Sequence, residues 1–119
     1  MLNTTEESSG ANPLWLLGWW AYEARHFELA AEASLLSIQL QPLALSPYIN
    51  RGLAYVAAGN VEAAQQSYDE AIAFFDRLDD ERVRMNKYNE GINDLHDVIA
   101  DPEGVVEMFI ELLETARDR

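Results

Sequence analysis

The residues of this chain that could take part in catalysis or metal binding are few. Cysteine is absent, and the two histidines, His26 and His96, lie far apart in the sequence, so a nucleophile paired with a base is not indicated. His96 is close to Asp94, Asp97 and Asp101, and a carboxylate–histidine set of this kind can bind a divalent metal. The spacing matches neither a zinc nor an EF-hand motif. We therefore expect a solvated acidic helix face and no metal site.

The net charge of the chain makes some classes of binding partner unfavourable. The chain has 119 residues and a formal net charge of −13, from 21 acidic and 8 basic residues. This charge repels phosphate backbones and anionic membrane surfaces, so neither nucleic acid nor a membrane is an expected partner. No apolar run approaches the roughly 20 residues that span a bilayer, and the first residues lack the basic region of a signal peptide. We expect a cytoplasmic protein that is not an enzyme and binds no cofactor, since a Gly-rich phosphate loop is also absent.

The stretch from Ser46 to Phe75 predicts two helices folded back on each other. Ser46 is a suitable N-cap, and the proline that follows it suits a first helical turn. Gly59 can close the first helix in a left-handed conformation, and Asn60 can cap the second. Gly52 lies inside the first helix, where glycine costs roughly 1 kcal/mol relative to alanine. Such a glycine indicates that another helix approaches closely.

The pattern of this hairpin occurs twice. Sliding the chain along itself until Gly18 lies over Gly52 also places Ala30 over Ala64. The second copy resembles a tetratricopeptide repeat, a family whose period of about 34 residues equals this offset. The resemblance is carried by Tyr48, Gly52, Tyr55, Gly59, Asn60, Ala64, Tyr68 and Ala71. The first copy resembles one through Leu17, Gly18 and Pro42, with Arg25-His26 in place of the Gly-Asn turn and Ser34 and Ser37 in place of the Tyr and Ala of the second helix.

The resemblance implies an all-α superhelix, a right-handed solenoid of about six helices. We expect a flexible tail over 1–11 and one domain over 12–119, with repeats over 12–45 and 46–79. The register is then lost, but helical periodicity and an Asp-Pro-Glu helix start predict two further helices, over 80–99 and 102–117. We assign these to capping, because a stack of repeats needs atypical end units.

Members of this family bind a peptide or a helix in a groove lined by the first helix of each pair. The groove positions carried over to this chain are apolar and aromatic, namely Trp15, Trp19, Tyr22, Glu23, Ile49, Leu53 and Val56. The resemblance therefore implies a protein–protein interaction module, an adaptor or co-chaperone-like scaffold whose partner is another protein or peptide. Two alternatives remain: the chain's own C-terminal helices fill this groove, or exposed apolar faces pair in a homodimer.

Basic residues are concentrated in one short segment, at Arg77, Arg82, Arg84 and Lys87. They could contact a partner's carboxylates. The stronger expectation is that they form bridges within the chain, to Asp76, Asp79 or Glu81, because exposed charge pairs of this kind are common and weak.

Overall fold

Six helices follow one another along residues 13–119, the part of the chain that the computed structural model describes. They are α2 (Pro13–Glu23), α3 (Phe27–Leu40), α4 (Ser46–Ala58), α5 (Val61–Phe75), α6 (Glu81–His96) and α7 (Val106–Arg117). These residues contain no strand, so the all-α prediction is confirmed. The predicted tail over 1–11, and Asn12 as a cap for the first helix, lie outside the described residues.

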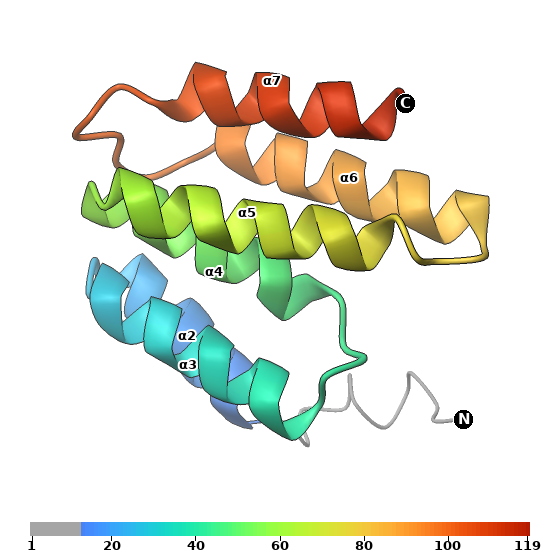
Figure 1. Ribbon diagram of the computed structural model, residues 1–119. Coiled ribbons are helices and arrows are strands. Elements are labelled where there is room, and N and C mark those ends of the chain that lie inside the picture. The colour runs from blue at the N-terminus through green and yellow to red at the C-terminus, as the bar shows by residue number, and fades with distance from the viewer. Residues whose placement is uncertain (1–12) are drawn as a thin grey trace.

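The helices form three consecutive pairs (Figure 1). The pair α2–α3 lies at one edge, α4–α5 in the middle, and α6–α7 at the other edge. Helix α4 contacts α3, α5 and α6. Buried side chains from all six helices join in one hydrophobic cluster. Among the helices of residues 13–119, the middle pair is therefore covered on both sides, while the first pair has a neighbour on one side only.

The turns inside the first and second pairs have the same geometry at equivalent positions of the two copies. Arg25 has φ 67° and Gly59 has φ 78°. The N–H of Arg25 donates to the carbonyl of Tyr22, and that of Gly59 to the carbonyl of Val56, each over 3.0 Å. The side chain of Asn60 accepts a hydrogen bond from the first turn of α5, as predicted. The two turns thus share one geometry, although arginine replaces glycine in one of them.

The start of α4 differs from the prediction. The helix includes Ser46, and Leu45 occupies the cap position without a side-chain hydrogen bond. The Ser46 hydroxyl instead donates to Glu90 over 3.0 Å and accepts from Lys87 over 3.1 Å. Ser46 as an N-cap was therefore wrong. Its hydroxyl ties α4 to α6.

The C-terminal pair was predicted over 80–99 and 102–117, but its second helix begins later, at Val106. The carboxylate of Asp101 accepts the N–H of Val105 over 2.9 Å and that of Val106 over 3.4 Å. The cap position itself is held by Val105, without a side-chain cap hydrogen bond, so the helix start predicted at Asp101 was wrong. The helix itself begins only after a turn that the sequence pattern did not reveal.

The interior glycines lie where neighbouring helices approach most closely. A Cβ placed on Gly52 would lie 2.6 to 2.8 Å from three ring carbons of Tyr68, which is fully buried. A Cβ on Gly18 would lie 3.4 Å from the Cβ of Ala33, which is ordinary contact. The predicted packing of a bare backbone against the returning helix is confirmed in both pairs, and it is much tighter in the second.

We predict that Gly52→Ala destabilises the protein while Gly18→Ala does not. The added methyl at Gly52 meets a ring that cannot move, so we expect the free energy of unfolding to fall by about 1–3 kcal/mol. At Gly18 the space is sufficient, and the helix propensity of alanine should raise that free energy by up to about 1 kcal/mol. Urea unfolding followed by circular dichroism measures both, and equal effects of the two substitutions would refute this difference in packing.

A second prediction concerns the turns. Arg25→Gly should raise the free energy of unfolding by up to about 1 kcal/mol, because a left-handed conformation costs an L-residue about 1–2 kcal/mol. Gly59→Ala should lower it by about 1 kcal/mol or more, since Pro102 also lies 3.1 Å from the position of the new methyl. Thermal unfolding would show shifts of several degrees in opposite directions. Arg25→Ala is the control, and a stabilisation equal to that of Arg25→Gly would mean that the backbone conformation is not the cause.

Candidate functional site

The histidines and the acidic residues around His96 do not gather into a site. His26 is exposed in the α2–α3 turn, and His96 is exposed at the end of α6. Asp101, an expected neighbour of His96, uses its carboxylate to accept the N–H of Val105, directly before α7. Within residues 13–119, no three or more His, Cys, Asp or Glu side chains are arranged to hold a metal ion.

The groove residues expected on α2 fall into three environments. Trp19 is 44% exposed and stacks on Tyr22, with ring centroids 5.9 Å apart. Tyr22 is buried, and its hydroxyl accepts the N–H of Ile99 over 3.1 Å. Glu23 is exposed at the end of the helix. The side chain of Trp15 lies outside the described residues. Among the groove residues expected on α2 whose side chains are described, Trp19 and Glu23 are the ones that a partner could reach.

The groove residues expected on α4 are not accessible. Ile49, Leu53 and Val56 are all buried, with at most 5% exposed. A Cβ on Gly91 would lie 3.2 Å from the Ile49 side chain, so the bare backbone of α6 closes over α4 at this point. The alternative in which the C-terminal helices fill the groove is therefore supported at Ile49. An open groove running along α4 was the wrong expectation.

A small hollow remains between α2, α3 and α4. Its cavity volume is about 20 Å³, which is room for about one water molecule. The residues that line it come from all three helices, and they are Gly18, Trp19, Tyr22, Ala30, Ser34, Ser37, Asn50 and Leu53. The Oγ of Ser37 is buried here without a hydrogen-bond partner. Trp19 is half exposed at this hollow, so its ring separates the interior from solvent.

The hollow exists because the first pair has a small residue where the second pair has a large one. Ser34 and Tyr68 occupy equivalent positions of the two copies, as do Gly18 and Gly52. In the second pair the Tyr68 ring covers Gly52; in the first pair the serine Oγ would lie 3.9 Å from a Cβ on Gly18 and fills far less space. The serines were visible as departures from the repeat pattern, and that departure was the signal for a hollow. No feature of the sequence indicated that Asn50 of α4 would also line the hollow.

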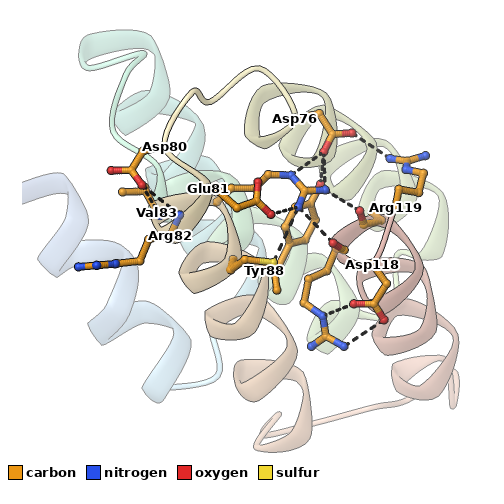
Figure 2. Close-up of polar contacts among 12 residues, drawn as sticks. Asp76, Asp80, Glu81, Arg82, Val83, Tyr88, Asp118 and Arg119 are labelled. Atoms are coloured by element: carbon orange, nitrogen blue, oxygen red, sulfur yellow. Dashed lines mark hydrogen bonds and ion pairs between the residues drawn. The ribbon is translucent and has the colours of Figure 1, made fainter.

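Two basic residues of the 77–87 segment, Arg84 and Lys87, form ion pairs within the chain. Arg84 pairs with Asp76 over 3.3 Å and with Glu81 over 3.4 Å, and it donates to the carbonyls of Ala116 and Arg117 at the end of α7. Figure 2 shows Asp76 facing Arg119, with which it forms a second ion pair over 2.9 Å. The expectation of internal bridges is confirmed for Arg84. This cluster joins the ends of α5, α6 and α7.

Asp94 on α6 carries an unfavourable negative charge. Burial, followed by repulsion from Glu90 and Asp97, raises its pKa to about 6, while Lys87 acts in the opposite direction. The pKa of Tyr22 is also raised, mainly by burial and in part by the charge of Asp94. A carboxylate therefore lies beside the tyrosine that supports Trp19, and it is held there against its preference for water.

Comparison of the chain with protein-family models, with curated proteins and with solved structures gave no match. The resemblance to tetratricopeptide repeats therefore stays a prediction, and it rests on the residues quoted for it. Among residues 13–119, no helix combines the length and apolar character that crossing a membrane requires.

We predict that Asp94→Asn stabilises the protein at pH 7. The folded-state pKa of about 6 lies above the reference value of 3.8, so the stability that this group contributes is present below about pH 4 and lost as the pH rises through 6. After allowance for partial exposure, the gain at pH 7 should be about 1 kcal/mol, with little change at pH 4. Urea unfolding at both pH values tests this, with the exposed Asp79→Asn as the control. Destabilisation by Asp94→Asn at pH 7 would contradict it.

Proposed function

We propose that this protein is a protein–protein interaction module that binds a peptide or helix of another protein at the α2–α4 hollow, as an adaptor would. The observation that carries the proposal is the half-exposed Trp19 ring beside a hollow that the fold leaves unfilled. The expected cytoplasmic location belongs to this proposal and rests on composition alone.

Trp19 has the properties of a binding anchor. Tryptophan is among the residue types that contribute most to interface affinity, especially beside a pocket that excludes water. Its ring is already positioned by stacking on Tyr22, whose hydroxyl is held by Ile99. A partner that covers Trp19 would therefore bury a large apolar surface without first having to order it.

The hollow favours an apolar side chain as the part of the partner that binds. Its lining includes the apolar side chains of Leu53 and Ala30 and two aromatic rings, while Ser37 offers a buried hydroxyl. The cavity itself is too small for a side chain, so the partner's apolar side chain would lie over its mouth, against the exposed part of the Trp19 ring. The proposed contact therefore leaves Trp19 in the position that its stacking on Tyr22 gives it.

The test is affinity capture from the source cell with the wild-type protein, Trp19→Ala and Met108→Ala as baits, followed by quantitative mass spectrometry. Met108 on α7 is also 44% exposed, so it is a matched control for loss of an exposed apolar side chain. We expect Trp19→Ala to lower partner recovery at least tenfold, consistent with loss of about 2 kcal/mol at a hot spot, while Met108→Ala retains it. Circular dichroism checks that both variants fold. Identical partner profiles for all three baits would refute the proposal.

Leu53→Ala is not an equivalent test, because this side chain is buried in the core rather than exposed in a groove. It should lower the free energy of unfolding by about 2–5 kcal/mol.

A further inference from the structure

Large exposed hydrophobic side chains are concentrated on the first helical pair. Along residues 13–119 they are Leu17, Trp19, Trp20, Leu29, Leu36, Leu40, Leu43 and Met108. Seven of these eight precede α4, and within the described chain only Met108 lies beyond it. Scattered single exposed hydrophobics are normal, but a group on one element indicates an interaction surface.

Four of these leucines are exposed on α2 and α3, and we call them the end face: Leu17, Leu29, Leu36 and Leu40. Leu29, Leu36 and Leu40 recur at i, i+7 and i+11 on α3, which places them on one stripe. On α2, Gly18 faces α3 while Trp19 lines the hollow toward α4. Successive helical residues point about 100° apart, so Leu17 lies on the flank opposite to Trp19.

No helix of the described chain covers the end face. Figure 1 shows α2 and α3 as the outermost pair, with α4 and α5 on their inner side. Stacked helical pairs need a polar terminal unit to remain single. The α6–α7 pair meets that need at the other edge, where the outer side chains include Glu107, Glu111 and Thr115, all exposed. The α2–α3 pair instead exposes the leucine side chains of the end face.

The charge distribution indicates what covers the end face. Residues 13–45 contain four charged side chains, Glu23, Arg25, Glu28 and Glu32, which give a net charge of −2. Residues 46–119 contain sixteen acidic and seven basic side chains, a net charge of −9. A basic partner would be drawn to this acidic part rather than to the end face. Two copies of this chain repel each other there, and they can approach with little repulsion through the end face.

We infer that the end face pairs with the end face of a second copy, forming a closed two-fold dimer. At the far edge of the described chain, the α6–α7 pair, Met108 is the one large exposed hydrophobic side chain, so a second copy offers no large apolar face there. The same face of each copy then forms the contact. Such an assembly is complete with two copies and does not extend into a filament. This inference is independent of the proposed function, since Trp19 lies on the opposite flank of α2 and stays accessible in the dimer.

The test is sedimentation equilibrium over a range of protein concentrations. The wild-type mass should rise from 13.4 kDa toward twice that value and no further. Leu36→Glu places like charges across the contact and should raise the dimer Kd at least tenfold. Met108→Glu, a matched control because 44% of Met108 and 47% of Leu36 is exposed, should retain the dimer. Trp19→Ala should also remain dimeric, which separates failure of this inference from failure of the proposed function.

Two further measurements test the dimer even if Leu36→Glu fails to fold. Leu40→Gln changes a side chain that is 70% exposed at the end of α3, and it should weaken the dimer with no loss of helical circular dichroism. Added salt should strengthen the wild-type dimer, because it screens the repulsion between the two acidic bodies. A wild-type protein that stays at the monomer mass, a mass that grows beyond two copies, or equal effects of Leu36→Glu and Met108→Glu would overturn the inference.

Discussion

The packing of the Tyr68 ring against the bare backbone of Gly52 is the contact on which the helix arrangement depends. Any side chain at Gly52 would overlap the ring, so α4 and α5 can lie this close only because glycine is there. The same ring lies 5.2 Å from that of Phe109, which brings α7 against the middle pair. One fully buried side chain thereby joins α4, α5 and α7, and the interior is close-packed around it in the way that makes cores sensitive to a single added methyl.

The first helical pair has the same backbone design without the ring, and its properties follow from that difference. Its turn repeats the left-handed geometry of the second pair, and Gly18 meets the returning helix as Gly52 does. Ser34, however, replaces the tyrosine, so a hollow remains and Trp19 lies half exposed beside it. The second pair is covered by helices on both sides, whereas the first has a described helical neighbour on one side. Both proposed contact surfaces therefore belong to the first pair, where the fold leaves apolar surface uncovered.

Local chemistry explains which features could be predicted from the sequence. The close packing at the glycines and the Gly59–Asn60 turn depend on residues close in sequence, and they were predicted correctly. The closure of the groove depends on which helix approaches Gly91, and a lone glycine does not identify its neighbour. Ser46 was assigned to a cap because the Lys87 and Glu90 side chains that engage its hydroxyl lie on a helix far along the chain. The accessible site was thus only partly predictable, because burial is set by contacts between distant segments.

The most direct test of the central contact is the proton NMR spectrum of Gly52. The three nearly equal distances to the Tyr68 ring carbons place the missing side chain over the ring face, so one Hα of Gly52 points at that face. The account predicts that this proton is shifted strongly upfield and shows nuclear Overhauser contacts to the Tyr68 ring. An ordinary glycine Hα shift without such contacts would contradict the account, because α4 and α5 would then not meet at this position.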